Sequence, residues 1–443
     1  MKSITLKDVD GFNSAYESRP SSKLIHNALY KLSISDLAFI GDNMVGKNFN
    51  FSIDIKTLPA ANQKASGRCW LFAATNLLRE RVAKEKNLEN FELSQAWLAF
   101  WDKFERANYY LESIIELIDR DTDDRTLSFI IQNGVSDGGQ WDMFVNVIEK
   151  YGILPKDNFP DNAQSSSTGQ MNNQLNVYLK SCTAKLRRLY KEGASPHTIQ
   201  SEKAEMIKKI YVFLVSCYGK PPKTFDFEYK DKDGKIFVEK DHTPLSFKEK
   251  YVGDMLNDYV SIINGPTSNK PFGKLYTVEY LGNVAEGDIV KYLNLPMDEF
   301  KDAVLSQLKD GEIVWFGSDC GKFGERDTKA LWDPALYDYD AVTGLDTYID
   351  KADALDYYYS AMNHAMVITG VHLVDDKPTR WKIENSWGEN GPNKGYYFSS
   401  DEWFDRFVYQ AVVNKKYLEK YSDVLNSTPT VLKPWDPMGT LAE

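Results

Sequence analysis

The chain has 443 residues, of which 42% are hydrophobic and 13% aromatic, so it is long enough to bury a large core in two or three domain-sized regions. Acidic residues (64) outnumber Lys and Arg (53), and the net charge of -11 argues against a general attraction to nucleic acid or to an anionic membrane. The sequence contains no apolar stretch of transmembrane or signal-peptide length. Four cysteines without a CxxC pair fit neither a disulfide framework nor a zinc site. We therefore expect a cytoplasmic protein with reduced thiols.

The first part of the chain, residues 1–60, is expected to form an N-terminal extension that includes one short strand. Residues 61–155 are expected to form a helical lobe, because apolar residues recur there at helical spacing. The first of its helices would begin at Cys69, and the last would end at Gly152. The three helical segments are CWLFAATNLLRERVAKEKN, LSQAWLAFWDKFERANYYLESIIELIDR and GGQWDMFVNVIEKYG.

Residues 156–270 differ in character and are interpreted as a helical insertion domain. A polar loop is followed by two charged helical stretches, and the alternating segment around Asp233 and Gly234 predicts a β-hairpin. Residues 271–430 then contain apolar runs of strand length and are expected to form a β-rich lobe. These runs are LYTVEYL, EIVWFGSD, HAMVITGVHLV, RWKIENSW and GYYFSS. Residues 431–443 form a C-terminal tail.

Cys69 can act as a nucleophile only as a thiolate, which a helix N-terminus and a nearby imidazolium both favour. Of the five histidines, His364 is the best candidate base because it opens an apolar strand, a rigid place from which an imidazole can face a cleft. Asn385 on the next strand could orient its second ring nitrogen. Taken singly, a cysteine in an apolar helix is more often inert packing, and a histidine at a strand edge is more often structural. Only the combination favours catalysis.

Three segments resemble the active-site blocks of papain-like cysteine peptidases, and they occur in that family's order: QKASGRCWLFA, NHAMVITG and WKIENSWGENGPNKGYYF. In papain-like enzymes the histidine and asparagine follow the cysteine by about 130–150 residues. Here His364 follows Cys69 by 295 residues, and the insertion accounts for most of the excess. A papain core with a long extension and a helical insertion resembles the aminopeptidase C and bleomycin hydrolase family. The segments FELSQAW, DGGQWDM and PWDPMG extend this resemblance over nearly the whole chain.

The resemblance implies an α+β fold with two lobes, one helical and one like a β-barrel, joined to the helical insertion. It assigns Cys69 as the nucleophile, His364 as the acid and base, and Asn385 as the group that holds His364. Gln63 would donate to the oxyanion together with the backbone N–H of Cys69. No metal or organic cofactor is implied.

The resemblance also names residues around this catalytic set. Trp387 would cover the bond between the histidine and the asparagine, although a core aromatic is an equally good interpretation. Gly138 and Gly139 would offer extended backbone to a peptide, although they could equally form a plain turn. Secreted papain-like enzymes carry a disulfide where this chain has Ser66 and Ser136, which agrees with a reducing compartment.

In the family that this chain resembles, the C-terminal tail lies in the cleft and restricts cleavage to peptides with a free N-terminus. The candidate residues are Thr440, Leu441, Ala442 and Glu443. Relatives often end at the equivalent of Ala442, so we expect the enzyme to remove Glu443 itself. Members of the family also assemble as hexamers, which predicts a homohexamer here.

Three functions remain open from the sequence. The first is an aminopeptidase that acts on peptides with a free N-terminus. The second is an endopeptidase with the same core and a disordered tail. The third is a nucleic-acid-binding protein with dispensable catalysis, against which the net charge of -11 and the complete catalytic set argue.

Overall fold

The computed structural model describes residues 1–442, which divide into two compact units. Unit 1 consists of residues 1–49 and 333–349, and unit 2 contains the rest. No helix in the described part of the chain is long and apolar enough to cross a membrane. The boundaries drawn above between extension, lobes, insertion and tail stay predictions.

Unit 1 is mainly helical, and its helices were not indicated by the sequence pattern. The first helix, α1, begins after Thr5, whose hydroxyl accepts from the Asp8 N–H while the Asp8 carboxylate accepts from the Thr5 N–H. An antiparallel bridge between Phe39 and Tyr337 joins the two segments of the unit. Its helices are α1 (Leu6–Ser18), α2 (Ser22–Leu29), α3 (Ile34–Ala38), η1 (Gly41–Met44), η4 (Pro334–Leu336) and α13 (Tyr339–Thr343).

The three helices predicted for residues 61–155 are confirmed, with boundaries set by local chemistry. The helix α4 begins at Cys69, as expected, and ends before Asn87, which adopts a left-handed conformation with φ 54°. The Ser94 hydroxyl accepts from the Trp97 N–H and so caps α5. The helices of this region are α4 (Cys69–Lys86), α5 (Gln95–Glu116), α6 (Arg125–Asn133) and α7 (Trp141–Tyr151).

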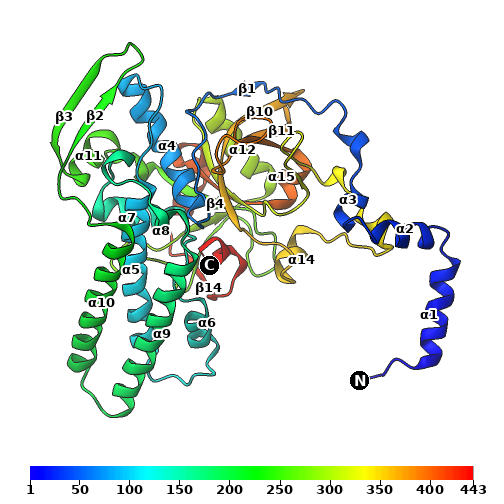
Figure 1. Cartoon of the computed structure of the whole chain (residues 1–443), viewed down its shortest axis with the longest axis horizontal. Helices are drawn as coiled ribbons and strands as arrows, with labels where there is room; N and C mark the ends of the chain where they lie inside the picture. Colours follow the sequence, from blue (N-terminus) through cyan, green and yellow to red (C-terminus); the bar gives the residue numbers. More distant parts are fainter. Residues whose placement is uncertain (443) are drawn as a thin grey trace. The chain divides into compact units, whose positions relative to one another are not determined.

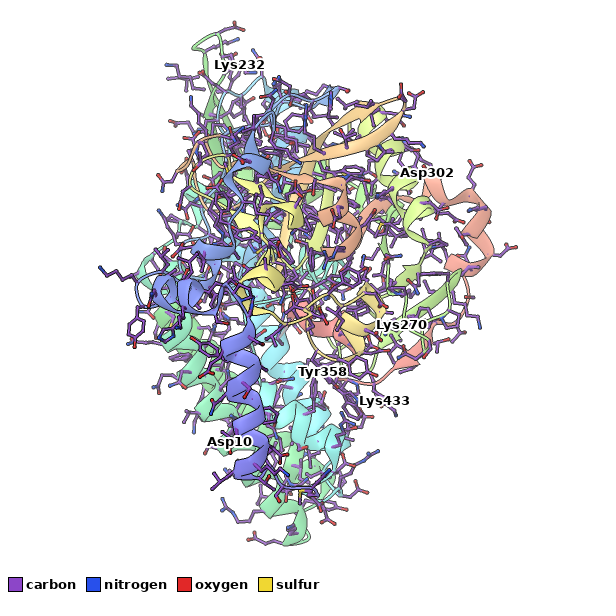
Figure 2. The ribbon with its side chains drawn as sticks, turned by 90° about the vertical axis from the view of Figure 1, so that its right-hand side faces the viewer. Asp10, Lys232, Lys270, Asp302, Tyr358 and Lys433 are labelled. Atoms are coloured by element: carbon purple, nitrogen blue, oxygen red, sulfur yellow. The ribbon has the colours of Figure 1, made fainter. Side chains whose placement is uncertain are left out.

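The two charged helices and the hairpin predicted for residues 156–270 are also confirmed. The long helices α9 and α10 pack alongside α5 and form a helical layer at one side of unit 2 (Figure 1). The hairpin turn carries Lys232 and projects from the unit (Figure 2). The elements are η2 (Lys156–Asn158), α8 (Ala163–Ser166), α9 (Gly169–Lys191), α10 (Pro196–Tyr218), β2 (Phe225–Lys230), β3 (Ile236–His242), α11 (Pro244–Tyr251) and η3 (Met255–Asp258).

A large mixed sheet forms the second part of unit 2, and the predicted strands lie in it. The central strands run in the order β4, β13, β7, β10, β11 and β12. The strands of the sheet are β1 (Ile53–Asp54), β4 (Tyr259–Ile263), β5 (Lys274–Val278), β6 (Tyr292–Asn294), β7 (Val314–Ser318), β8 (Gly324–Glu325), β9 (Leu331–Trp332), β10 (His364–Val374), β11 (Lys377–Glu384), β12 (Tyr396–Ser400), β13 (Val408–Asn414) and β14 (Thr430–Leu432).

Two hydrophobic clusters stabilise unit 2. One lies among the helices α4, α5, α7, α9 and α10, and the other lies between the sheet and the helices α12 and α15. The remaining helices of the unit are α12 (Met297–Lys309), α14 (Lys351–Asp356), α15 (Asp401–Phe407), η5 (Lys415–Tyr421), α16 (Ser422–Leu425) and η6 (Pro437–Ala442). The chain therefore has the α+β fold expected from its sequence, with a helical part and a strand-rich part.

A buried carboxylate joins these two parts. Glu384, the last residue of β11, accepts hydrogen bonds from Asn76 Nδ2 and Arg79 Nη2 of α4, both at 2.7 Å. Its second oxygen accepts from the Thr57 hydroxyl at 2.6 Å. Arg79 and Glu384 are both fully shielded from solvent. Burial raises the pKa of Glu384 to about 7, although Arg79 acts against this shift. The hydrogen bonds and the ion pair together therefore fix α4 against β11.

We predict that Arg79→Met lowers the free energy of unfolding by about 3–5 kcal/mol, because it leaves the Glu384 carboxylate buried without its counter-charge. The double variant Arg79→Met/Glu384→Gln should regain a large part of that loss, since no unpaired charge remains. Urea unfolding at a fixed protein concentration measures both quantities. A loss below about 1 kcal/mol in the single variant would contradict this role of the ion pair.

Candidate active site

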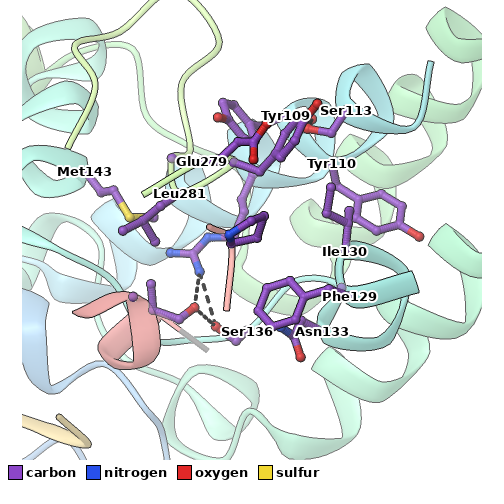
Figure 3. A pocket seen from close by; sticks show the side chains of 17 residues that line it. Tyr109, Tyr110, Ser113, Phe129, Ile130, Asn133, Ser136, Met143, Glu279 and Leu281 are labelled. Carbon is purple, nitrogen blue, oxygen red and sulfur yellow. Dashed lines mark hydrogen bonds between the residues drawn. The ribbon is translucent and has the colours of Figure 1, made fainter. Parts of the chain in front are cut away.

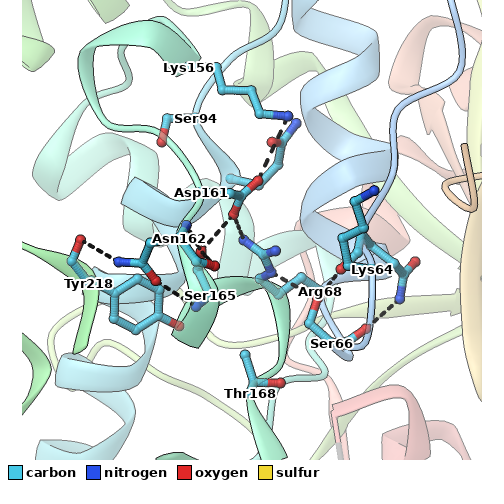
Figure 4. A network of polar contacts seen from close by, with 12 residues as sticks. Lys64, Ser66, Arg68, Ser94, Lys156, Asp161, Asn162, Ser165, Thr168 and Tyr218 are labelled. Carbon is cyan, nitrogen blue, oxygen red and sulfur yellow. Dashed lines mark hydrogen bonds and ion pairs between the residues drawn. The ribbon is translucent and has the colours of Figure 1, made fainter.

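Cys69 occupies the first position of α4, and the residues around it hold the start of the helix in place. The Arg68 side chain is almost fully buried and forms an ion pair with Asp161 at 2.7 Å, while its Nε donates to the Ser66 hydroxyl at 2.9 Å (Figure 4). Trp70 is fully buried and donates its indole N–H to the Asp137 carbonyl oxygen at 2.7 Å. Cys69, the predicted nucleophile, therefore lies at a firmly anchored helix end.

His364 begins β10, as the sequence predicted, and its imidazole lies between two predicted partners. Its Nε2 is 2.8 Å from Asn385 Oδ1, and Trp387 stacks on the ring with centroids 5.1 Å apart. The strand register explains the pairing: Val367 lies opposite Glu384, so Asn385 continues opposite Met366, on the same face of β10 as His364. Asn385 follows the end of β11 rather than lying within it.

The side chains of Cys69 and His364 are both almost completely buried. The Ala365 backbone N–H donates to Cys69 Sγ at 3.4 Å, so the sulfur lies directly beside the start of β10. Burial raises the pKa of the Cys69 thiol to about 11 and lowers the pKa of His364 to about 4, because each charged form alone would lose its hydration. A helix N-terminus and a neighbouring imidazolium act in the opposite sense, so a thiolate at Cys69 would need a protonated His364 beside it.

Gln63 lines the same cleft as Cys69 and His364. Both the nitrogen and the oxygen of its side-chain amide form hydrogen bonds. Its Nε2 donates to the Ser66 carbonyl oxygen at 2.6 Å, and its Oε1 accepts from the Ser386 hydroxyl at 2.6 Å. The Gln63 backbone N–H also donates to the Ser386 carbonyl oxygen at 2.8 Å. An amide held in this way keeps one N–H free to donate to a developing negative charge near Cys69.

The cleft has a volume of about 460 Å³, and residues from distant parts of the chain line it. Gln63, Cys69 and His364 meet there with Thr440 and Leu441 of the C-terminal segment. The sequence-predicted catalytic residues and two of the predicted tail residues are thus brought together.

Gly138 and Gly139, the two glycines before α7, are both buried, and each lies close to a different part of the chain. A Cβ added to Gly138 would lie 2.2 Å from the Leu441 carbonyl oxygen, so the absence of a side chain lets the tail approach the backbone there. A Cβ added to Gly139 would lie 2.5 Å from the Trp70 ring. Gly138 therefore leaves room for the short helix η6, which contains Leu441, and Gly139 packs against α4.

The C-terminal segment is held along its length. Asp436 forms a buried ion pair with Lys270 at 2.9 Å, and the Met438 carbonyl oxygen accepts from the Tyr292 hydroxyl at 3.2 Å. The Thr440 hydroxyl donates to the Met362 carbonyl oxygen at 2.9 Å, and Leu441 is buried. Predicted site residue Glu443 lies outside the described residues.

Three residues near the cleft were not identified as site residues from the sequence: Arg106, Ser136 and Asp137. The Ala442 carbonyl oxygen accepts from Ser136 Oγ at 2.7 Å and from Arg106 Nη1 at 3.0 Å. The Asp137 carboxylate accepts from the Gly67 N–H at 3.0 Å and forms an ion pair with buried Lys103, which holds the pKa of Asp137 well below its usual range despite burial. Arg106 lies in the middle of an amphipathic helix, where nothing in the sequence separates it from a surface arginine.

The chain is similar to known proteins over its whole length. Residues 3–439 match the model of the Peptidase C1-like family. An aminopeptidase C of Lactobacillus delbrueckii subsp. lactis is 46% identical over 100% of this chain and 99% of its own, and human bleomycin hydrolase is 40% identical over 89% of both. The crystal structure of PepW from Lactobacillus rhamnosis HN001 superposes with a TM-score of 0.96 at 45% identity, covering 99% of each chain.

We predict that His364→Ala slows alkylation of Cys69 by iodoacetamide at pH 7 by about tenfold or more, because burial alone then sets the pKa of the thiol. The rate should rise steeply toward pH 9 and above instead of levelling off. Mass spectrometry of the Cys69 peptide follows the reaction separately from the other three cysteines. Asn385→Ala, which keeps the imidazole, should slow alkylation less; equal rates in His364→Ala and the unmodified protein would contradict the pairing.

Proposed function

Since the chain belongs to the Peptidase C1-like family, we propose that it is a cysteine aminopeptidase of broad specificity that removes N-terminal residues from peptides. The observation that carries the proposal is the position of the C-terminal segment. Thr440 and Leu441 line the same cleft as Cys69 and His364, so a peptide cannot extend freely past the nucleophile on that side. Relatives named aminopeptidase C, 42–48% identical to this chain, support the same activity.

In the proposed reaction, Cys69 transfers its proton to His364, and the thiolate attacks the scissile carbonyl carbon. The developing oxyanion accepts hydrogen bonds from Gln63 Nε2 and from the Cys69 backbone N–H. Protonated His364 then donates its proton to the leaving amine, and a thioester remains on Cys69. Water hydrolyses the thioester while His364 removes its proton. Asn385, at 2.8 Å from Nε2, keeps the ring oriented through both steps, and Trp387 shields that bond from water.

The tail restricts this reaction to free N-termini in two ways. It fills the place next to Gly138 in which a longer peptide would pair with the backbone. The tail also carries the acidic residue Glu443, whose charge would attract the ammonium group of the substrate. A blocked N-terminus offers no such positive charge. With a disordered tail the same core would act as an endopeptidase. The ordered contacts of Thr440 and Ala442 favour the aminopeptidase.

We place the enzyme in a reducing compartment, the cytosol. This proposal is supported by the four cysteines, all of which are free thiols. A nucleic-acid-binding role has no comparable support, because the net charge is -11 and the catalytic residues converge in one cleft.

We predict that deletion of residues 440–443 weakens cleavage of an amino-acid anilide with a free α-amine and creates cleavage of the same anilide with a blocked amine. The deletion removes both the steric stop and the negative end while leaving Cys69 and His364 in place. Rates for the two substrates, before and after deletion, give the test. Intact mass measured beforehand establishes whether residue 443 is present in the active protein.

The Cys69→Ser substitution serves as the control in the full chain and in the deletion variant. It should abolish cleavage of the free and of the blocked anilide while the fold is kept. The endopeptidase alternative would hold instead if the full chain already cleaves the blocked anilide and the deletion changes nothing.

The enzyme is also proposed to form a homohexamer, and the outer face of α1 supports self-association. Leu6, Val9, Phe12 and Tyr16 follow one another at helical spacing and are 86%, 39%, 60% and 48% exposed, respectively, and no residue of α1 is buried. A short helix of this kind is not stable in water without a partner surface. A second copy of the chain is the proposed partner.

We predict that the double variant Val9→Asp/Phe12→Asp shifts the protein from hexamers toward smaller species, since two charges replace apolar contact area in each copy. Size-exclusion chromatography with light scattering measures the mass. Lys7→Asp on another face of the same helix is the matched control. A monomeric parent protein, or hexamers that the double variant leaves intact, would contradict this role of α1.

A further inference from the structure

Arg106 connects three segments, which are its own helix α5, the loop with Ser136 and Gly138, and the C-terminal tail. Its Nη1 donates to Ser136 Oγ at 3.2 Å and to the Ala442 carbonyl oxygen at 3.0 Å. Its Nη2 donates to the Gly138 carbonyl oxygen and to Asp102 Oδ1 of the same helix, the latter at 3.3 Å. One guanidinium therefore contacts both the tail and the backbone against which the tail lies. We propose that Arg106 is a positioning residue that sets where the tail ends and thereby determines the specificity of the enzyme.

Contacts outside the tail also hold the Arg106 side chain. Arg106 is 7% exposed and Asp102 2%, and the two form an ion pair one turn apart on α5. Asp102 is itself held by Asn283 Nδ2 at 2.9 Å. A planar guanidinium fixed in this way can donate in two directions at once, which the single ammonium of a lysine does not reproduce.

Ala442, the last described residue, packs against the helical core on one side and is held by polar contacts on its carbonyl oxygen. A small cavity of about 90 Å³ adjoins Arg106 and Ala442 and is walled by aromatic side chains that include Tyr109 and Phe129 (Figure 3). Because this space is not filled by protein atoms, Ala442 has room to move on that side. Two donors, Arg106 Nη1 and Ser136 Oγ, converge on its carbonyl oxygen and remove that freedom.

The contact is separate from the anchors nearer the core. Lys270 holds Asp436, and Tyr292 holds the Met438 carbonyl, several residues before the tail reaches the cleft. Loss of Arg106 therefore frees the end of the tail while its base stays attached. The inference rests on the proposed tail-restricted activity and adds the residue that fixes the length of the free cleft.

The test compares Arg106→Gln, Arg106→Lys and Ser136→Ala in the full chain, with the free and the N-blocked anilide as substrates. For Arg106→Gln we expect KM for the free substrate to rise about tenfold with kcat changed less than about threefold, because chemistry at Cys69 is untouched. Cleavage of the blocked substrate should rise about tenfold or more. Ser136→Ala, which removes one of two donors, and Arg106→Lys, which keeps the charge, should show smaller shifts in the same direction.

Arg187→Gln is the matched control. Arg187 is also a buried arginine, and it donates to the carbonyl oxygens of Leu117, Ile118 and Arg120. Unlike the residues of the site, it does not line the cleft. It should leave the ratio of the two activities unchanged. If deletion of residues 440–443 switches the specificity but Arg106→Gln and Ser136→Ala do not, the role of Arg106 is wrong and the proposed function stands. If the deletion also changes nothing, the proposed function itself fails. Should Arg106→Gln not fold, Ser136→Ala alone decides the outcome.

Discussion

The buried ion pair between Glu384 and Arg79 connects the two elements, β11 and α4, that position the residues of the candidate site. Glu384 directly precedes Asn385, and Arg79 lies on the helix that begins at Cys69. The same carboxylate also accepts from Asn76 and from Thr57. Since a charge without hydration tolerates little displacement of its partners, one buried group fixes the helix end that carries the sulfur relative to the strand end that orients the imidazole. This ion pair adds to the direct contacts at the site, which are the hydrogen bond between His364 and Asn385 and the one from the Ala365 N–H to Cys69 Sγ.

The dry surroundings of the site have opposite effects on single charges and on a pair. Burial alone raises the pKa of the Cys69 thiol and lowers that of His364. A thiolate beside an imidazolium is favoured in the same surroundings, because each charge replaces the hydration that the other has lost. In the proposed reaction, the Cys69 thiolate therefore depends on His364 for its stability as well as for proton transfer. Under the same proposal, exclusion of water by Trp387 and by the tail would strengthen this dependence.

The sequence predicts what depends on local pattern and fails where contacts join distant segments. Helical spacing located the start of α4 at Cys69, and strand patterns located His364 at the start of β10. The helices of unit 1 were missed although the sequence offered two signals in α1, which are the apolar residues at helical spacing from Leu6 to Tyr16 and the capping residues Thr5 and Asp8. The role of Arg106 could not be inferred at all, since its partner Ala442 is 336 residues away. The resemblance to papain-like peptidases supplied the roles of single residues, which periodicity does not contain.

Under the proposed function, the position of the tail would account both for broad specificity and for the restriction to N-termini. The Leu441 carbonyl approaches Gly138 so closely that any side chain there would collide with it. The tail would thus occupy the backbone surface that a longer peptide needs, and the groups that accept at Met438 and Ala442 are main-chain carbonyl oxygens. A tail that occupies backbone sites excludes peptides by their length. It does not distinguish between different side chains on the residue that is removed. A polar clamp at Ser136 and Arg106 suits such a stop, because donors aimed at a carbonyl oxygen fix its position without filling the cavity beside it.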